Sequence, residues 1–322
     1  MNLLFEKITN QNVIANQIEL PNTAYVYGVE TAPRFKTANH NELTIWYDDD
    51  PHIYFLLYPD GTRLPLLSVT TLLHLFEKPF DEERMSYRCA DKAEYNCECL
   101  NKEGWEMLHT SEKQERIKMA WKQNSEHAAT FGTTTHAVME ELTINPDTSI
   151  ENAYKMMTVK YNHWNDIIRY FANSYIHDIR DPWIAAGYEL IAEPLIFDLH
   201  IMTAGQADLV AINHQTKMIS VLDFKTNKRK PSKDASSYNK MEGIFNDLPQ
   251  IDYWKYAFQL CLYQWFISLK YPGYVLGNNY ILYMNRESGK VESIEINPTE
   301  IHPYLGKLYE YVINIRPQLY GF

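Results

Sequence analysis

The chain has little cysteine and no long apolar segment, and both absences exclude classes of protein. It carries four cysteines in 322 residues, Cys89, Cys97, Cys99 and Cys261. That is too few for a disulfide-stapled fold and is typical of a reducing compartment. No apolar run approaches the ~20 residues that a membrane span needs. The first residues lack the basic and apolar regions of a signal peptide. We therefore expect a cytoplasmic protein with no membrane partner.

The cysteines also lack the spacing of an iron–sulfur site. One residue separates Cys97 from Cys99, and Cys261 falls within a predicted helix. Cluster ligands follow other spacings along the chain. We therefore expect no iron–sulfur cluster.

Positive charge is scarce as well. Lys and Arg total 30 against 41 Asp and Glu, which gives a formal net charge of −11. This balance argues against a generally basic protein that coats nucleic acid, but it is compatible with a local contact. The most basic run, residues 225–233, contains Lys228, Arg229 and Lys230. Such a run is usually a solvated loop, and its position beside an acidic cluster makes a nucleic-acid contact the alternative.

The first half of the chain predicts a β-hairpin followed by helices. Residues 1–40 are weakly patterned and are expected to form an extension or a small cap. Apolar alternation predicts strands over 43–47 and 52–58, with a strong turn signal at 59–62. The helices expected next cover 68–76 with Ser68 as N-cap, 112–121 and 134–142 with an interruption at Phe131-Gly132, and 151–180 ending before Asp181-Pro182.

The pattern changes to strands after residue 186. We predict strands over 187–197 with a break at Pro194, over 203–212 and over 218–225, with a hairpin turn at 214–216. A helix over 253–269, strands over 280–284 and 290–296, and a helix over 298–315 complete the expected elements. Helices, then a mainly antiparallel meander, then a helix and more strands indicate an α/β or α+β core.

Asp223, Phe224 and Lys225 end the apolar strand 218–225. Side chains two apart on a strand share a face, so Asp223 and Lys225 point one way while Phe224 points into the core. If the hairpin centre is near Gln215, Asp208 lies beside Asp223 across the ladder. Two adjacent carboxylates repel unless a cation lies between them. Their oxygens suit Mg²⁺ or Mn²⁺, with the Phe224 carbonyl as a third ligand.

Such a site has the parts that phosphodiester hydrolysis needs. A metal activates a water and neutralises charge at phosphorus. Lys225 adds positive charge and can orient the water or help to remove its proton. Each member alone has an ordinary explanation: hairpin acids are usually solvated, His136 would usually end a helix, and Gln259 and Tyr263 would be helix neighbours. The ordered set is more specific than any of its members.

The set comprises Gly132-Thr-Thr-Thr-His136-Ala-Val-Met-Glu140, Glu193, Gly205-Gln-Ala-Asp208, Asp223-Phe-Lys225-Thr226 and Gln259-Leu-Cys-Leu-Tyr263. It resembles the motifs of the PD-(D/E)XK nuclease superfamily, in particular its RecB-like exonuclease branch. Upstream, His52-x-Tyr54 and Leu66-Leu-Ser68-Val-Thr70 are similar to a segment of mitochondrial genome maintenance exonucleases and phage relatives. Leu67 stands where those relatives often have proline.

The resemblance implies a restriction-endonuclease-like core, a mixed central sheet flanked by helices, over 130–322. An N-terminal β-hairpin and helical additions occupy 1–129. It also implies roles for the motif residues. Lys225 would be catalytic, Glu193 would bind a metal-bound water or a second ion, and the metal ligands would be His136, Asp208, Asp223 and the Phe224 carbonyl. Supporting or DNA-contacting roles fall to Glu140, Gln259, Tyr263 and Thr226.

In relatives that thread single strands, helices ahead of the Gly132 motif form an arch over the site. Residues 81–129 are polar, charged and helical in pattern, which suits such an arch. Trp105, Trp121 and Phe131 would then stack on bases, or else pack in a core. Ser68 and Thr70 would bind a phosphate at a helix start, or else only cap the helix.

We therefore expect an α/β enzyme, a Mg²⁺- or Mn²⁺-dependent DNA nuclease. The resemblance implies an exonuclease on single-stranded or end-containing DNA in replication, recombination or repair. Attack by a metal-activated water would leave a 5′-phosphate and a 3′-hydroxyl. The expected partners are DNA and a helicase, a recombinase or a single-strand-binding protein, in the host cytoplasm if the protein is phage-encoded. A structure-specific endonuclease or flap nuclease is the nearest alternative, and a catalytically inactive DNA-binding partner of a helicase or recombinase is the alternative of another class.

Overall fold

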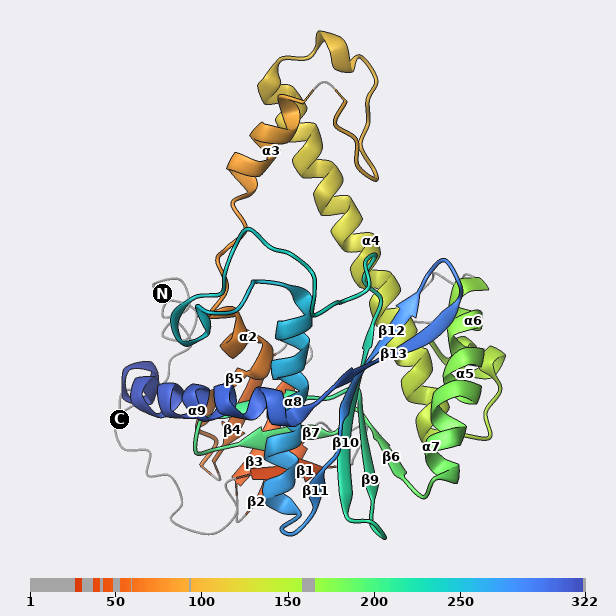
Figure 1. The fold of residues 1–322 in the computed structure, drawn as a ribbon, viewed down its shortest axis with the longest axis vertical. Helices are drawn as coiled ribbons and strands as arrows, with labels where there is room; N and C mark the ends of the chain where they lie inside the picture. The colour runs from red at the N-terminus through yellow and green to blue at the C-terminus, as the bar shows by residue number, and fades with distance from the viewer. Residues whose placement is uncertain are drawn as a thin grey trace.

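Two β-sheets covered by helices form the body of the molecule, and a helical projection rises from it (Figure 1). The computed structural model describes residues 27–30, 37–40, 43–48, 53–58, 60–92, 94–157 and 166–320. Both sheets contain parallel and antiparallel pairs. This architecture confirms the predicted fold class, mixed sheets flanked by helices.

The first sheet joins N-terminal strands to strands from the middle of the chain. Its order is β1-β7-β8-β5-β4-β3-β2. The strands are β1 Tyr27–Glu30, β2 Thr37–His40, β3 Leu43–Asp48, β4 Ile53–Leu57, β5 Arg63–Ser68, β7 Leu195–Asp198 and β8 Thr203–Gln206. The predicted hairpin is present as the antiparallel pairs β3–β4 and β4–β5. Apart from β1 and β2, the extension expected over 1–40 lies outside the described residues, as does His52.

The second sheet carries the Asp223 strand at its centre, in the order β13-β12-β10-β9-β6. The strands are β6 Glu189–Ala192, β9 Leu209–Asn213, β10 Met218–Lys225, β12 Asn279–Asn285 and β13 Lys290–Ile296, with the short β11 Val275–Leu276 beside β10. In the antiparallel β9–β10 pair, Leu222 is opposite Leu209. The next step along this register sets Asp208 opposite Asp223, so the expected juxtaposition is confirmed.

The chain crosses between the two sheets twice, at neighbouring points. The predicted strand 187–197 breaks before Pro194 as expected, but its halves, β6 and β7, belong to different sheets. The single strand predicted over 203–212 is wrong: it divides at Ala207-Asp208 into β8 and β9, again in different sheets. The alternation of apolar and polar residues shows which side chains share a face of a strand. It does not show which strands pair with each other, so the local sequence could not predict this division.

The described residues contain eight α-helices, most of which pack on the sheets. They are α2 Val69–His74, α3 Glu82–Ala90, α4 Thr110–Ile144, α5 Ile150–Met157, α6 Asp166–Ser174, α7 Asp181–Ala185, α8 Asp252–Lys270 and α9 Pro298–Tyr320. Of these, α3 and the first half of α4 extend away from the sheets (Figure 1). The Thr71 backbone N–H donates to Ser68 Oγ at 2.9 Å, which confirms Ser68 as the cap of α2. Among the described helices, none has the length and apolar composition of a membrane span.

Two helix predictions are wrong. Phe131-Gly132 does not interrupt α4, because one glycine inside a helix costs only ~1 kcal/mol and close packing at this glycine offsets that cost. The expected single helix 151–180 is divided. Its residues 158–165 lie outside the described residues, and its end widens into a π-helix at Tyr175–Arg180. Asp181-Pro182 begins α7 instead of ending a helix, since proline is well tolerated in a first turn.

The body buries both faces of β10. Ile219 and Val221 pack with α8 residues such as Phe258 in one cluster. Leu222 and Phe224 pack with α4 and α6 in another. Burial on both faces explains why 218–224 reads as a nearly continuous apolar run instead of an alternating one.

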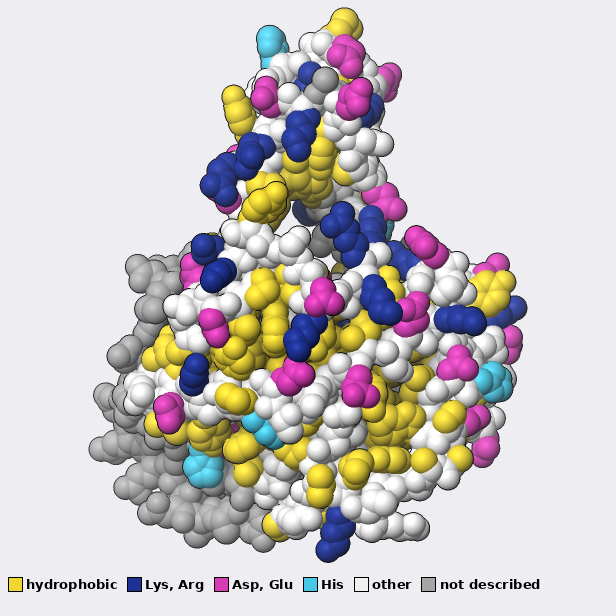
Figure 2. Space-filling model, in the orientation of Figure 1, with side chains coloured by type: hydrophobic (Ala, Val, Ile, Leu, Met, Phe, Trp, Pro, Cys, Tyr) yellow, Lys and Arg dark blue, Asp and Glu magenta, His cyan; other side chains and the backbone are white. Residues whose placement is uncertain are grey.

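The projection consists of α3, the loop after it and the N-terminal half of α4 (Figure 1). It has a small cluster of its own, which contains the buried Cys89, Ala90, Trp105 and Ile117. Lys and Arg side chains gather where the projection meets the body (Figure 2). Since α4 runs from Thr110 to Ile144, the boundary proposed between residues 129 and 130 falls inside one helix.

Candidate active site

The structure brings four of the predicted side chains together at the end of β10. They are His136 from α4, Asp208 ahead of β9, and Asp223 and Lys225 from β10 itself. His136 Nδ1 lies 3.5 Å from Asp208 Oδ2. The Phe224 backbone N–H donates to the same oxygen at 2.6 Å. Lys225 forms an ion pair with Asp223, as their shared strand face requires. The result is two carboxylates facing a lysine ammonium and a histidine ring.

The protein surroundings shift the pKa values of the two carboxylates in opposite directions. Burial raises the pKa of Asp223 to about 6; Lys225 opposes this shift and the nearby Asp208 adds to it. Burial also acts to raise the pKa of Asp208, but His136, Lys225 and the Phe224 N–H bond outweigh it and leave that pKa below its usual value. Asp208 is thus the better-stabilised anion, and Asp223 is held charged at neutral pH against the cost of burial.

The two carboxylates in turn act to raise the pKa values of His136 and Lys225. Burial acts to lower the pKa of His136, but Asp208 overcomes it and the net shift is upward. Burial likewise opposes charge on Lys225, whereas Asp223 and Asp208 raise its pKa. Lys225 Nζ also lies over the Tyr256 ring, 4.6 Å from its centroid. The two carboxylates thus favour the protonated form of Lys225.

Two motif glycines permit close packing around the site. A Cβ at Gly205 would lie 2.6 Å from two atoms of Tyr263, so the tyrosine ring occupies the space of the missing side chain. A Cβ at Gly132 would lie 3.3 Å from Thr226 Oγ1, so this glycine lets α4 approach the end of β10. The motifs around His136 and Asp208 therefore begin with glycine for steric reasons.

The other predicted supporting residues differ in position. Glu193 lies at the crossing between sheets with φ 49°, a strained value for a non-glycine residue. Its backbone N–H donates to the Asp208 carbonyl at 3.1 Å, which fixes the two crossings to each other. Gln259 hydrogen-bonds the buried Tyr263 from the preceding turn of α8. Glu140 follows His136 one helical turn later on α4.

The donor set matches a hard divalent cation in chemistry. Asp223 Oδ2 is buried and, although it contacts Lys225, accepts no well-formed hydrogen bond. Asp208, His136 and the Phe224 carbonyl are the neighbouring donors predicted from sequence. Within the described ranges, no three His, Cys, Asp or Glu side chains are already spaced as metal ligands. In the structure, positive charge beside these carboxylates comes from Lys225, and from His136 when it is protonated.

Comparison with protein families decides the classification. A model of the PD-(D/E)XK nuclease superfamily matches residues 108–315. The chain belongs to this superfamily. Searches of curated proteins and of solved structures found no match. Members are generally phosphodiester hydrolases that use divalent metals such as Mg²⁺, so the family supports a metal-dependent nuclease. The RecB-like branch stays a prediction.

The matched region contains all the predicted site residues except Ser68 and Thr70, and the whole upstream motif from His52 to Thr70 lies outside it. The parallel β5–β8 pairing sets Ser68 beside Ala204, near the Gly205 motif. Its hydroxyl is engaged in capping, bonded to the Thr71 backbone and side chain. The capping interpretation therefore accounts for Ser68, whereas Thr70 is exposed on the first turn of α2.

The predicted basic run leaves the end of β10 and turns toward the projection. Lys228 forms an ion pair with Glu98, and Lys230 forms one with Glu292 at 2.7 Å. Arg229 is exposed between them. These cations follow the end of β10 within a few residues, which is the position that the sequence suggested for contact with a polyanion.

The predicted aromatic residues have different surroundings. Trp105 is buried in the projection's cluster, which favours the core interpretation for it. Trp121 is half-buried, with Nε1 donating to the Tyr95 hydroxyl at 2.9 Å and its ring edge-on to Phe80. Phe131 lies lower on α4, edge-on to Phe171.

Sequence reasoning missed Tyr256 and Arg286. Tyr256 lies three residues before Gln259 on α8, and this spacing on one helix face was an available signal. Its hydroxyl bonds Asn227 at 2.9 Å while its ring lies under Lys225. Arg286, in the β12–β13 turn, donates to the Thr226 carbonyl at 2.9 Å. No local pattern marks Arg286, because its role depends on how the sheet is ordered.

Proposed function

We propose that the protein is a Mg²⁺- or Mn²⁺-dependent DNA exonuclease acting on single-stranded or end-containing DNA. The observation that carries the proposal is the buried pair Asp208 and Asp223 facing Lys225 and His136. Burying two neighbouring carboxylates is costly, and Lys225 only partly offsets that cost for Asp223, whose pKa stays raised; acidic pairs of this kind are typical of sites that bind a cation. A role in replication, recombination or repair, with a helicase, recombinase or single-strand-binding protein, is part of the proposal.

Each group has a distinct role in this proposal. Asp208, Asp223, His136 and the Phe224 carbonyl would hold the metal, which when bound supplies a Lewis acid and an activated water. Lys225, held by Asp223 and Tyr256, would place positive charge beside the attacked phosphate. Glu193 would add a further carboxylate beside Asp208, from the crossing of the two sheets.

The substrate preference rests on the projection. Two segments rise from the body to it, the chain between α2 and α3 on one side and α4 on the other (Figure 1). Lys78 and Gln250 fasten the first segment through reciprocal backbone–side chain hydrogen bonds of 3.0 and 3.1 Å. A strand with a free end could enter between two such supports, whereas a closed circle could not. The proposed division into 1–129 and 130–322 treats this projection as an arch over the site.

The test is cleavage of end-labelled single-stranded, double-stranded and covalently closed circular DNA, with a matched RNA. Each substrate is incubated with Mg²⁺, Mn²⁺ or EDTA, with wild-type protein and with Lys225→Ala. We expect metal-dependent degradation of linear DNA and a loss on the order of 10²–10³-fold in Lys225→Ala, as for removal of one oxyanion-stabilising group. Cleavage that survives EDTA, or is unchanged in Lys225→Ala, contradicts the mechanism.

The same substrates separate the alternatives. Cutting of closed circles would rule out an obligate exonuclease and favour the endonuclease alternative. Binding without cleavage under every metal condition indicates the catalytically inactive DNA-binding partner. Preferential degradation of RNA would overturn the proposed substrate class while leaving the metal chemistry in place.

A further inference from the structure

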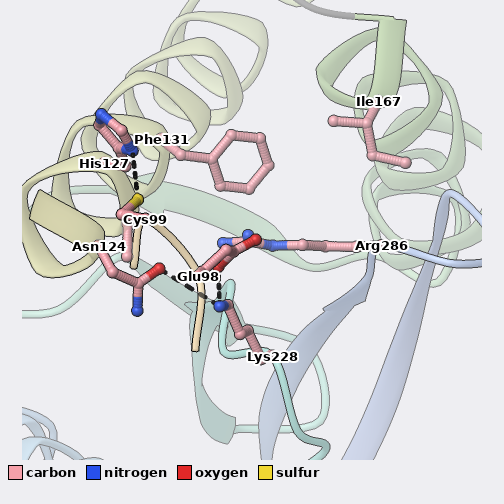
Figure 3. Close-up of a pocket in the computed structure, with 9 residues that line it drawn as sticks. Glu98, Cys99, Asn124, His127, Phe131, Ile167, Lys228 and Arg286 are labelled. Atoms are coloured by element: carbon pink, nitrogen blue, oxygen red, sulfur yellow. Dashed lines mark hydrogen bonds and ion pairs between the residues drawn. The ribbon is translucent and has the colours of Figure 1, made fainter. Parts of the chain in front are cut away.

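A pocket of about 310 Å³ lies where the projection meets the body, next to the proposed active site. Its walls come from α4, α6, the β12–β13 turn, the loop ahead of α4 and the segment after β10 (Figure 3). The residues that matter below are Glu98, Asn124, Phe131, Lys228 and Arg286. The volume falls at the lower end of the ~300–1,000 Å³ range of small-ligand pockets.

Arg286 connects this pocket to the catalytic strand. Its guanidinium lies over the Phe131 ring, 4.3 Å from the centroid. Its Nη2 donates to the carbonyl of Thr226, the residue after Lys225. Its Nε is buried and has no hydrogen-bond partner. The pocket is therefore lined by a cation that its contacts hold in a fixed orientation and attach to the end of β10.

Glu98 is the acidic residue among those that line this pocket. In Figure 3 its side chain lies beside Lys228 and near the Arg286 guanidinium. It forms an ion pair with Lys228, whose Nζ also donates to Asn124 Oδ1 at 3.3 Å. The Lys228 hydrogen bond and charge, together with Arg286 and His127, lower the pKa of Glu98. Both partners of the pair are more than half exposed, at 51% and 60%, and such pairs contribute little to stability.

We propose that this pocket is a subsite for one nucleotide of the substrate strand, and that Glu98 is an autoinhibitory substitute for its phosphate. The inference rests on the proposed nuclease function. Arg286 and Lys228 would bind the phosphate, since guanidinium and ammonium groups both recognise it. The base would pack against the side of the Phe131 ring that Arg286 does not cover. Glu98, carried by the projection's loop, leaves Lys228 when the strand enters.

A double-mutant cycle tests the competition. The dissociation constant of a short fluorescein-labelled single-stranded oligonucleotide is measured in EDTA for wild type, Glu98→Gln, Lys228→Gln and the double variant. Glu94→Gln, an exposed acid on the same loop, is the matched control for charge. We expect Glu98→Gln to tighten binding roughly three- to tenfold and Glu94→Gln to change it less than about twofold. The Glu98→Gln effect should disappear when Lys228 is also replaced.

Two results would overturn the proposal. One is equal tightening by Glu98→Gln and Glu94→Gln, which would reflect net charge alone. The other is an effect of Glu98→Gln that persists without Lys228, which would place the competition elsewhere.

A steric variant tests the pocket itself. Ala128 lines it, whereas the exposed neighbour Ala129 does not line it. Ala128→Trp should fill the space and weaken oligonucleotide binding about tenfold, while Ala129→Trp should leave the affinity near that of wild type. Equal affinities for the two tryptophan variants would count against a nucleotide in the pocket.

The outcomes distinguish this subsite from the nuclease function. If wild type degrades DNA but the cycle shows no coupling, only the subsite is rejected. If wild type neither binds nor cleaves nucleic acid with any metal, both proposals are rejected.

Discussion

The body and the projection share α4 but bury its two ends in different ways. In the projection only Ile117 and Ala120 of α4 are buried, against a small cluster. In the body Thr134, Val138 and Leu142 are among six buried residues of the same helix. Between 121 and 133, α4 has no buried residue, although this stretch is fully described. The proposed catalytic groups are thus anchored in a large core, while Glu98 and Lys228 of the pocket at the junction stay exposed.

The largest effect we predict is confined to the body. Asp223→Asn should reduce metal-dependent cleavage at least ~10³-fold, because it removes a proposed ligand charge. It should also stabilise the metal-free protein near neutral pH. The pKa of Asp223 is raised from 3.8 to about 6, so its favourable contribution is complete below pH 3.8 and is lost as pH rises through 6.

Thermal denaturation in EDTA between pH 4 and 8 measures this effect. The wild type should lose stability relative to Asp223→Asn across that window, by on the order of 3 kcal/mol at most. Glu94→Gln serves as an exposed control and should show no such divergence. A variant that loses more stability than wild type as pH rises would contradict the sign.

The next prediction compares two truncations on α4. Leu142→Ala, in the body, should lower the global free energy of unfolding by about 2–5 kcal/mol. Ile117→Ala, in the projection, should loosen mainly its own cluster. Hydrogen exchange followed by peptide mass spectrometry distinguishes the two, with lost protection expected over α3 and residues 105–120 for Ile117→Ala. Equal loss of protection throughout the chain in both variants would show that the two regions unfold as one unit.

A smaller effect is expected from Gly205→Ala, because the new methyl group would meet the Tyr263 ring at 2.6 Å. Overpacking of this kind costs about 1–3 kcal/mol. The matched control is Gly306→Ala in α9, where nothing lies within 4 Å of the new Cβ and helix propensity should give a gain of up to ~1 kcal/mol. Urea denaturation measures both. If Gly205→Ala is neutral, the tyrosine ring does not fix the position of the Asp208 motif.

Residues with local signals were predictable from sequence. The β9–β10 turn fixed the register that sets Asp208 opposite Asp223, and Ser68 marked the start of α2. The ordered motif set identified the superfamily, and the structure brings His136 and Asp208 to 3.5 Å. The predictions that were wrong concerned elements whose boundaries depend on contacts with residues distant in sequence. The division of 203–212 depends on two sheets, and the continuity of α4 through Gly132 depends on packing against Thr226. Arg286 is placed by tertiary contacts alone, whereas the spacing of Tyr256 from Gln259 on α8 was a signal that went unused.

The continuity of α4 makes this helix a lever. His136 and Thr110 lie on one rigid rod, and a helix rises about 1.5 Å per residue, so roughly 40 Å separate them. A tilt of about 10° at the His136 end would therefore displace the other end by roughly 7 Å. Conversely, a force applied to the projection reaches the His136 side chain with little loss, because no break in the helix absorbs it. A molecule that binds the tip of the projection and tilts α4 would therefore also move His136 relative to Asp208.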